Sequence, residues 1–348
     1  MNFLLTLVIL IIILGLIVFV HELGHFIAAK KSGVHVYEFA IGMGPKIFSF
    51  KRKNDPTIYS LRLLPLGGFN AIASTMETCE GVKESEVLEN KSGFKRFAVL
   101  VMGIVFNFIL SIILLFINGL IYGSPVTSPY LGNVLEGSAA ELGGLKENDL
   151  ILKINDKSVN SWDDVLLETK FGKDLETYTF LVNRNGEELT INVSPTYKEV
   201  DGEKTKEFGF SSSTRKEKGF VNALKYGFVG TYKNTVSAFN ILGKLFTGKV
   251  GAENLSGPIG VFSVIDNVKE NGLVSLIYLT AYLSINVAVI NFIPIPVFDG
   301  GRLLLLVIEK IKGKKLNPKV ETTLNNICAI LLIILMIYVT FNDIFRLF

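Results

Sequence analysis

The sequence predicts a multi-pass α-helical membrane protein with four transmembrane helices, a membrane-associated β-hairpin or small sheet, and an inserted α+β domain. Its 348 residues are 49% hydrophobic and include 26 phenylalanines, a composition typical of a chain with several apolar spans. Four stretches are long and apolar enough to cross a bilayer, at about 3–27, 96–122, 273–298 and 324–347. Between them lie a stretch with strand-like runs and a longer polar stretch, which indicate the hairpin and the inserted domain.

The composition also excludes several classes of protein. The net charge of +3 is small, and no basic patch interleaved with aromatic residues predicts a nucleic-acid partner. Cys79 lies in a polar loop and Cys328 in an apolar run, so we expect neither a disulfide framework nor a cysteine-rich metal site. The N-terminal stretch lacks the basic start of a signal peptide and its apolar run is longer, so we expect a retained helix with membrane lipid around it.

The first predicted helix ends in His21-Glu22-Leu23-Gly24-His25, an H-E-x-x-H pattern. Positions i and i+4 lie one turn apart on one face of a helix, so both imidazoles can reach one ion. Glu22 can then reach a water bound to that ion. An ionisable side chain at the centre of a membrane helix costs about 2.5–3.5 kcal/mol, which favours a functional role. The alternative is a histidine pair that caps a transmembrane helix at the lipid interface.

Positive charge in the loops predicts the orientation in the membrane, because cytoplasmic loops carry an excess of lysine and arginine. Two loops have this excess, between the first and second spans and between the third and fourth: Lys30, Lys31, Lys46, Lys51, Arg52, Lys53, Lys91, Lys95 and Arg96 in one, and Arg302, Lys310, Lys312, Lys314 and Lys315 in the other. We therefore expect both loops in the cytoplasm, with both termini and residues 123–272 outside. The metal site then lies near the cytoplasmic face.

The loop from about residue 35 to residue 90 has structure of its own. Strand-like runs at 34–39 and 57–63 are punctuated by glycines and prolines, which predicts a β-hairpin or small sheet. It lies either against or partly in the membrane, where protein must cover its edges, or in solvent; the pattern leaves both open. Residues 77–91 carry repeated glutamates and predict a solvated, mobile loop.

Residues from about 124 to 197 predict a soluble domain. A strand around residue 133 precedes the turn Gly137-Ser138-Ala139-Ala140, a strand begins at Asp149, and Asn185-Gly186 separates two alternating runs as in a β-hairpin. This order resembles a bacterial PDZ domain, which we assign to 124–200. Gly143 and Asn148 depart from the usual PDZ pattern. The resemblance implies that extended peptide ends bind by strand addition, with a cradle of backbone groups from Leu131, Gly132, Asn133 and Val134.

Two alternatives remain open for the middle part of the chain. The PDZ-like stretch could instead be a small β-domain that only spaces two helices. Apolar residues alternate with lysines over 218–249, which predicts an amphipathic helix on the outer membrane surface or a soluble helix packed on the PDZ-like domain. We therefore divide the chain into 1–123 with the first two transmembrane helices, the PDZ-like 124–200, an amphipathic membrane-surface region at 201–272, and 273–348 with the last two transmembrane helices.

The third span ends in a second polar motif, Asn291-Phe292-Ile293-Pro294-Ile295-Pro296-Val297-Phe298-Asp299-Gly300-Gly301. Two prolines in such close succession break a helix and free backbone groups, which a membrane tolerates only where protein or a polar cavity surrounds them. A two-histidine helix needs one more protein ligand to make an open tetrahedral zinc site, and Asp299 fits that need. The alternative is an interfacial turn before Gly300-Gly301.

Together these motifs resemble the site-2 protease family. H-E-x-x-H ends the first helix, N-x-x-P-x-P-x-x-D-G follows the third, and a PDZ-like domain lies between them, as in the bacterial regulator-of-sigma branch with one PDZ domain. The resemblance covers essentially the whole chain and extends to 42–46, 65–69, Asn107-Phe108 and 257–260. Gly103-Ile104 stands where Gly-Pro is common in the family, which affects only an expected helix kink.

The resemblance implies an intramembrane zinc metalloprotease of the bacterial cytoplasmic membrane. Its substrates would be membrane-anchored proteins that another protease has clipped, such as anti-sigma factors or signal-peptide remnants. It implies zinc on His21, His25 and Asp299, and Glu22 as general base. It also implies that residues 57–69 form a re-entrant β-element and that two asparagines help to hold the substrate, Asn286 and Asn291.

Two rival functions come from other classes. One is a membrane-tethered PDZ scaffold whose metal site is structural or inactive; a closed structural zinc site needs a fourth ligand, and His35, the remaining histidine, lies beyond the helix. The other is a metal transporter that uses His and Asp as a pathway. Glu22 argues against the transporter, because a simple ligand pair does not require it.

Overall fold

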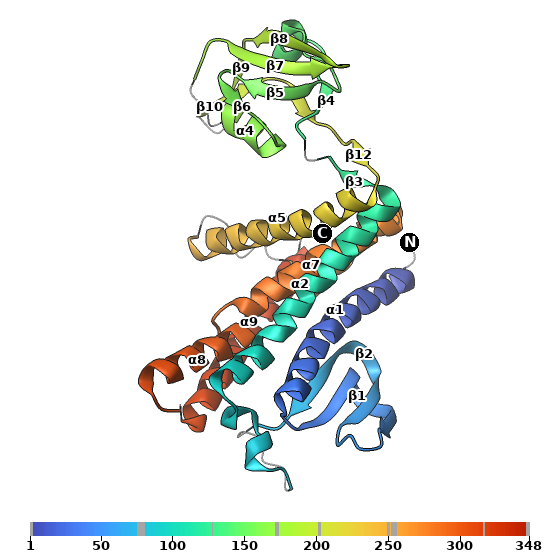
Figure 1. Ribbon diagram of the computed structural model, residues 1–348, viewed down its shortest axis with the longest axis vertical. Helices are drawn as coiled ribbons and strands as arrows, with labels where there is room; N and C mark the ends of the chain where they lie inside the picture. The colour runs from blue at the N-terminus through green and yellow to red at the C-terminus, as the bar shows by residue number, and fades with distance from the viewer. Residues whose placement is uncertain are drawn as a thin grey trace. The chain divides into compact units, whose positions relative to one another are not determined.

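Two compact units make up the chain in the computed structural model (Figure 1). The first joins Met1–Asn118 to Leu224–Phe348, and the second is Gly119–Ala223. The structure describes residues 3–74, 81–126, 128–170, 174–200, 203–248, 251, 256–315 and 317–345. The second unit is thus an insertion into the chain of the first.

Four helices of the first unit are long and apolar enough to cross a membrane, which confirms the predicted number within the described residues. They are α1 (Phe3–Ser32), α2 (Gly93–Tyr122), α7 (Leu273–Phe292) and α9 (Pro318–Phe345). Further helices are α5 (Phe220–Phe246), α6 (Pro258–Val268) and α8 (Asp299–Lys312). The sequence predicted that the third span reaches residue 298. Helix α7 ends earlier, at Phe292, because Pro294 and Pro296 cannot continue it.

Helix α6 contacts several other helices of the helical unit. Its Ile265 is fully buried in a cluster with residues of α1, α2 and α7, namely Ile13, Ile17, Leu110 and Leu279. At its start, the buried Asp343 of α9 accepts a hydrogen bond from Gly260 N at 2.8 Å. At its end, Asp266 accepts one from Thr6 of α1 at 2.6 Å. The Gly257-Pro258 break therefore begins a helix that is fixed to α9 at one end and to α1 at the other.

Helix α5 packs against α2 and α7. Gly227 lies so close to α2 that an added Cβ would be 2.8 Å from Ile112 O. The Thr231 hydroxyl lies 3.2 Å from that of Ser111, and Ala238 is buried with Ile285. Residues 224–246 therefore belong to the helical unit, although the sequence left open whether this helix lies on the membrane or on the inserted domain.

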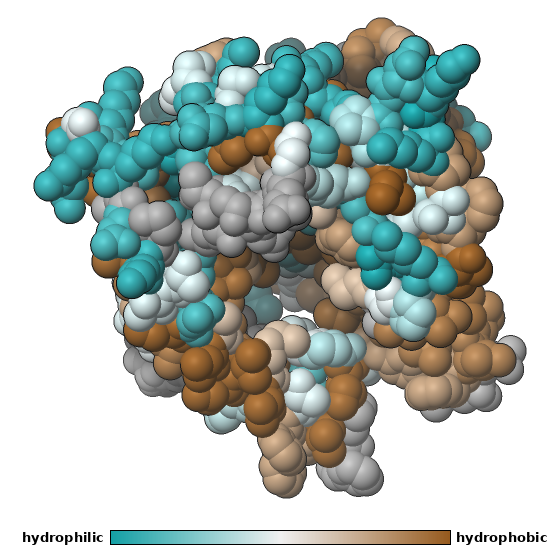
Figure 2. All heavy atoms as spheres, turned by 90° about the horizontal axis from the view of Figure 1, so that it is seen from below, coloured by the Kyte–Doolittle hydropathy of each residue, from teal (hydrophilic) through white to brown (hydrophobic). Residues whose placement is uncertain are grey.

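Much of the apolar surface of the helical unit is exposed. In the most apolar window of α9 only 11% of the residues are buried inside the protein, and in that of α1 17% are. Hydrophobic and hydrophilic side chains gather in separate areas of the face in Figure 2 (brown and teal). Such surface is expected where lipid rather than water surrounds the helices, which agrees with an integral membrane protein.

A β-hairpin follows α1, as the sequence predicts. Strand β1 (Val36–Lys51) pairs antiparallel with β2 (Ile58–Ile72). Residues 38–41 have partners in both halves of β2, at 58–61 and 68–71, and residues 46–51 pair with 58–62. Gly67, at φ +77°, lets β2 approach α1, because an added Cβ would be 2.8 Å from Val18 Cγ1. The hairpin exposes large apolar side chains on both strands, namely Ile41, Met43, Ile47, Phe48, Phe50, Leu61, Leu63 and Leu64.

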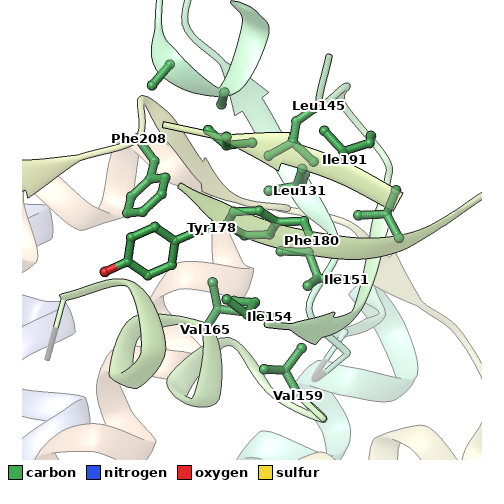
Figure 3. Close-up of a cluster of buried hydrophobic side chains, with 14 residues drawn as sticks. Leu131, Leu145, Ile151, Ile154, Val159, Val165, Tyr178, Phe180, Ile191 and Phe208 are labelled. Atoms are coloured by element: carbon green, nitrogen blue, oxygen red, sulfur yellow. The ribbon is translucent and has the colours of Figure 1, made fainter. Parts of the chain in front are cut away.

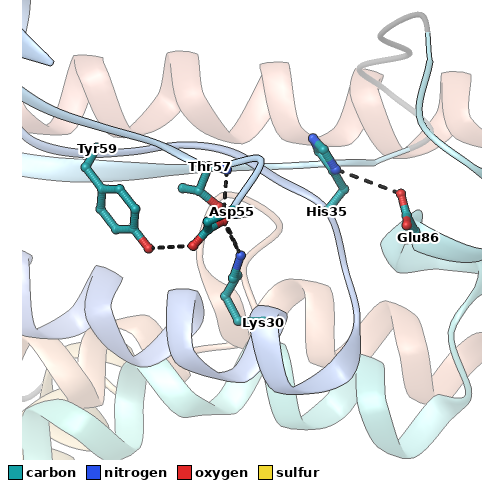
Figure 4. Close-up of polar contacts among 6 residues, drawn as sticks. All are labelled: Lys30, His35, Asp55, Thr57, Tyr59 and Glu86. Carbon is teal, nitrogen blue, oxygen red and sulfur yellow. Dashed lines mark hydrogen bonds and ion pairs between the residues drawn. The ribbon is translucent and has the colours of Figure 1, made fainter. Parts of the chain in front are cut away.

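A polar cluster fixes the hairpin turn to the end of α1 (Figure 4). Asp55 accepts hydrogen bonds from Lys30 Nζ at 2.6 Å, from Thr57 N at 3.0 Å and from Tyr59 Oη at 3.0 Å. Burial disfavours the charged Asp55 carboxylate, but these partners outweigh it and hold the pKa of Asp55 below its ordinary range.

The described part of the glutamate-rich stretch differs from the predicted plain loop. Residues 81–91 contain two short 3₁₀ helices, η1 (Glu84–Glu86) and η2 (Leu88–Asn90). Leu88 is buried with Val36 and Val99, and its N–H donates to Ala73 O at 3.0 Å. One apolar side chain thus anchors a segment whose charge suggested full solvation. Cys79 and Glu77 lie outside the described residues.

The inserted unit contains a four-stranded antiparallel sheet in the order β6-β5-β7-β8. The strands are β5 (Leu150–Ile154), β6 (Lys157–Ser158), β7 (Tyr178–Arg184) and β8 (Glu187–Val193). Asn185 and Gly186 both have positive φ, 55° and 96°, so the predicted β7–β8 hairpin is confirmed. Helices α3 (Ala139–Gly143) and α4 (Trp162–Lys170) complete the unit around a buried core that includes Tyr178 and Phe180 (Figure 3).

Strands from both ends of this unit pair with each other. Strand β4 (Leu131–Val134) pairs with β11 (Phe210–Ser212), and β3 (Ser124–Pro125) pairs with β12 (Lys216–Glu217). Strands β9 (Thr196–Val200) and β10 (Glu203–Glu207) pair with each other between them. The sequence assigned 201–272 to an amphipathic membrane-surface region. That boundary was too early, because Phe208 lies in the buried core of this unit and Phe210 of β11 packs against it. These two apolar residues are far from the rest of the core in the sequence, so they give only a weak local pattern.

Candidate metal centre

Helix α1 brings the two histidines of H-E-x-x-H together. His21 Nε2 and His25 Nε2 are 3.1 Å apart, and the rings lie edge to face. His21 is 8% exposed, and the side chain of His25 is 12% exposed. The i, i+4 spacing therefore gives the arrangement that the sequence predicted, with both Nε2 atoms directed at one point.

Asp299 adds a third ligand atom from a distant part of the chain. Its Oδ2 lies 3.1 Å from His21 Nε2 and 3.2 Å from His25 Nε2. Two ligand atoms bound to a tetrahedral zinc ion at about 2.0–2.2 Å are roughly 3.3–3.6 Å apart, close to this spacing. Within the described part of the chain, these three residues form the one group of histidine, cysteine or carboxylate side chains that could hold a metal ion.

The chemistry of the three atoms also fits a cation. His25 Nδ1 lies 2.7 Å from Val99 O, and because a carbonyl only accepts, this nitrogen carries the proton and Nε2 offers a lone pair. Asp299 Oδ2 is buried and has no aligned hydrogen-bond donor. Lone pairs so close together repel one another unless a positive charge lies among them. A zinc ion satisfies this arrangement with an N, N, O ligand set, and the residues present fit it.

Glycines allow the elements to approach closely enough. An added Cβ on Gly300 would lie 2.2 Å from Phe292 O, and one on Gly301 2.2 Å from Ile295 O. The start of α8 therefore fits against the proline-broken connection, and Asp299 is its first residue. On the other side, an added Cβ on Gly24 would lie 2.3 Å from Met102 O, and one on Gly103 2.3 Å from His25 Nε2.

Comparisons with known proteins agree with this geometry. The sequence profile of peptidase family M50 matches residues 9–335. The chain belongs to peptidase family M50. It is 34% identical to the regulator of sigma-W protease RasP of Bacillus subtilis, and the match covers 99% of both chains. It is also 36% identical to a putative zinc metalloprotease of Fusobacterium nucleatum over 99% of both chains, and 33% identical to the zinc metalloprotease RasP of Geobacillus kaustophilus over 97% of both.

The expected family and activity are therefore confirmed: the chain is a zinc metalloprotease of the site-2 protease family, with zinc as its cofactor. Glu22, which directly follows His21 in the sequence, is partly buried. It lies close enough to His21, His25 and Asp299 to interact electrostatically with all three. A carboxylate in that position can exchange a proton with a water at the metal.

The other predicted site residues lie on α7 and in the inserted unit. Asn286 and Asn291 are partly buried residues on the second half of α7, and no hydrogen bond within the described residues joins either to the three ligands. In the inserted unit, Leu131 N donates to Asp149 O at 2.8 Å, and Leu131 O accepts from Asn148 N at 2.9 Å. Strand β11 covers the other edge of β4. Leu131, at the start of the predicted peptide cradle, thus has partners on both edges of β4.

One buried residue beside the ligands was not predicted as part of the site. Asn107 of α2 is fully buried, and its Nδ2 lies 3.4 Å from His21 Nδ1. In the sequence, Asn107 stands out only as part of the family-like Asn107-Phe108. Its position in an apolar helix, one turn after Gly103, is the signal that could have identified it.

Proposed function

We propose that this M50 peptidase hydrolyses peptide bonds in or beside the transmembrane segment of membrane-anchored proteins that have already been clipped. His21, His25 and Asp299 hold the zinc ion, and Glu22 is the general base. The observation that carries the proposal is the convergence of Nε2, Nε2 and Oδ2 within 3.2 Å of one another, on elements that include a candidate membrane span.

The mechanism follows from the chemistry of these residues. When bound, zinc lowers the pKa of a coordinated water towards about 7 and polarises a carbonyl oxygen. Glu22 accepts the proton of the attacking water and later delivers it to the leaving amine. The Val99 carbonyl keeps the proton of His25 on Nδ1, so that Nε2 remains available. Asn286 and Asn291, on the helix that leads to Asp299, hold the substrate backbone.

The hairpin is the element we assign to substrate presentation. A helical substrate hides its peptide bonds, so it must be extended before cleavage. Residues 38–41 and 58–61 have strand partners on both sides, so the outer edges to which an extended segment can add lie along 46–51 and 68–72 among the described residues. Their exposed apolar side chains, such as Phe48 and Leu63, suit a re-entrant element at 57–69 that contacts lipid.

For the inserted unit we propose a PDZ domain that binds the ends of clipped substrates. Because β11 covers one edge of Leu131–Val134 and Leu131 is bonded on the other, we assign strand addition to the outer edge of β11, which pairs only with β4 among the described strands. Phe210 of β11 packs edge to face on Trp162 of α4, with ring centroids 5.9 Å apart. A peptide added to this edge would lie beside β11, with β4 as the next strand of the sheet.

The membrane and the substrate class complete the proposal. By loop charge, the metal centre is near the cytoplasmic face of a bacterial cytoplasmic membrane and the inserted unit is outside. The Bacillus subtilis relative is named for regulation of sigma-W. By likeness, we propose membrane-anchored anti-sigma factors or signal-peptide remnants as substrates.

One comparison of variants tests this function against the scaffold alternative. Purified wild type, Glu22→Gln and Asp299→Ala are assayed for bound zinc and for cleavage of a clipped, membrane-anchored model substrate. Glu22→Gln should retain zinc and lose at least about 100-fold in cleavage rate, because it cannot take a proton. Asp299→Ala should lose most of the zinc. The exposed Glu270→Gln is the matched control and should cleave normally. Normal cleavage by Glu22→Gln would leave the scaffold as the better explanation.

A further inference from the structure

The orientation of His21 depends on a nitrogen that faces away from the ligands. His21 Nδ1 points to α2, where the Asn107 side-chain amide lies 3.4 Å away. Asn107 is 0% exposed, and its Oδ1 has no hydrogen-bond partner. Because water does not reach this amide, its orientation depends on the hydrogen bond between the two side chains.

The proton on His21 decides that orientation. A neutral imidazole carries one N–H, and metal binding through Nε2 requires the proton on Nδ1. The group next to Nδ1 must then be an acceptor. An asparagine offers one at Oδ1, and the two ends of its amide have nearly the same shape, so they exchange by a simple rotation of the amide.

We propose that Asn107 is a positioning residue whose Oδ1 accepts a hydrogen bond from His21 Nδ1–H, which fixes the tautomer of His21 that binds zinc. The inference rests on the proposed metal centre. Asn107 contacts neither the reacting atoms nor the metal; it acts through His21.

Helix α2 presents a polar group to the Nδ1 atom of each histidine. His25 Nδ1–H donates to the main-chain oxygen of Val99, and His21 Nδ1 faces the side chain of Asn107, two turns further along α2. Between them, Gly103 leaves no room for a side chain, since an added Cβ would lie 2.8 Å from His21 Cε1. One face of α2 therefore supplies an acceptor for each histidine and the space in which both rings fit.

A third helix holds Asn107 in place. Ser284 of α7 is fully buried, and its hydroxyl donates to the main-chain oxygen of Asn107 at 2.9 Å. Helix α7 leads directly to the connection that ends at Asp299. The main chain at Asn107 is thus held against the helix that leads to Asp299.

The test uses substitutions of similar size on the full-length chain. Asn107→Asp keeps an acceptor, whereas Asn107→Leu keeps the volume but can neither accept nor donate. Zinc affinity is measured by competition with a chelator. We expect Asn107→Leu to bind zinc about 10–100-fold more weakly than wild type, the usual cost of losing such a partner. Asn107→Asp should stay within about threefold of wild type. If Asn107 only fills space, the charged Asp should instead be at least as damaging as Leu.

A second asparagine on the same helix serves as the matched control. Asn118 is also buried and donates to Val274 O at 2.7 Å, but it has no contact with the ligands. Asn118→Leu should lower thermal stability and leave zinc affinity unchanged. A ¹⁵N spectrum of the zinc-loaded wild type, whose three histidines are few enough to resolve, should show His21 protonated at Nδ1. Wild-type affinity in Asn107→Leu, or an unprotonated Nδ1, would overturn the inference. Undiminished zinc in Asp299→Ala would instead reject the metal centre itself.

Discussion

Small residues around the metal centre matter as much as the ligands. Gly24 and Gly103 let α1 and α2 approach at the histidines, and Gly300 and Gly301 let α8 begin against the connection from α7. At each of these positions an added Cβ would meet main-chain atoms or a ligand at 2.3 Å or less. The geometry of the site is therefore encoded partly in the absence of side chains.

This dependence predicts the effect of one methyl group at Gly103. In Gly103→Ala the new Cβ would lie 2.3 Å from His25 Nε2, so the ring must move away from the other ligands. We expect zinc to fall well below one equivalent in the purified protein, measured by elemental analysis. Gly243→Ala on α5, where nothing lies within 4 Å, is the control. It should keep its zinc and gain up to about 1 kcal/mol of stability, since alanine favours a helix.

The three proposed ligands can be predicted from the sequence because their signals are local. His21 and His25 are spaced by one helical turn, and Asp299 follows two prolines. Asn107 gave only a weak signal, because its role depends on which helix faces α1. The two departures from the PDZ pattern have structural reasons as well. Asn148 adopts φ +69°, which asparagine tolerates, and an added Cβ on Gly143 would lie 2.9 Å from Asn192 O.

At the level of elements, the hairpin depends on its attachment to α1. The sequence predicted both strands from strand-like runs at 34–39 and 57–63, which glycines and prolines punctuate. It did not predict the cluster around Asp55, because Lys30 and Asp55 are 25 residues apart and belong to different elements. The segment at 81–91 was predicted as a loop for a similar reason: the contact of Leu88 with Val36 is not visible in a local pattern.

The Asp55 cluster predicts a loss of hairpin stability in acid. The pKa of Asp55 is lower in the folded protein than in the unfolded chain, where it is about 3.9. Its contribution is therefore complete above that value and disappears as the pH falls through the folded-state pKa. Hydrogen–deuterium exchange of residues 36–72, corrected for intrinsic rates, should be faster at pH 3 than at pH 5.

A substitution isolates this effect. Asp55→Asn cannot ionise, so its corrected exchange at pH 5 should already be faster than that of wild type and should change less on acidification. If wild type and Asp55→Asn respond to acid equally, other carboxylates govern the hairpin.

For the whole molecule, orientation in the membrane is the main open prediction. Loop charge predicts that the hairpin side is cytoplasmic and the inserted unit external. A reporter fused near residue 85 should be active only inside the cell, and one fused near residue 185 only outside. The reverse result would put the metal centre near the opposite face.

The boundaries of the inserted unit predict how it can be removed. Replacement of residues 124–217 by a short Gly/Ser linker removes every strand that pairs with β3, β4 or β9. We expect this variant to fold, bind zinc and cleave, but to discriminate less between clipped and unclipped substrates. Removal of 126–197 alone leaves β11 without β4 and β10 with only part of β9, so it should give a lower yield of folded protein.

The pairing of β3 with β12 has one more consequence. Lys216 lies opposite Pro125 and Glu217 opposite Ser124, so the chain leaves the unit beside the point where it enters. A module whose two ends meet imposes almost no span on the chain that hosts it. Evolution can then lengthen, duplicate or exchange the module as a cassette, and the host helices need not be respaced. The inserted unit can therefore diversify in sequence while the metal chemistry of the host helices stays constant.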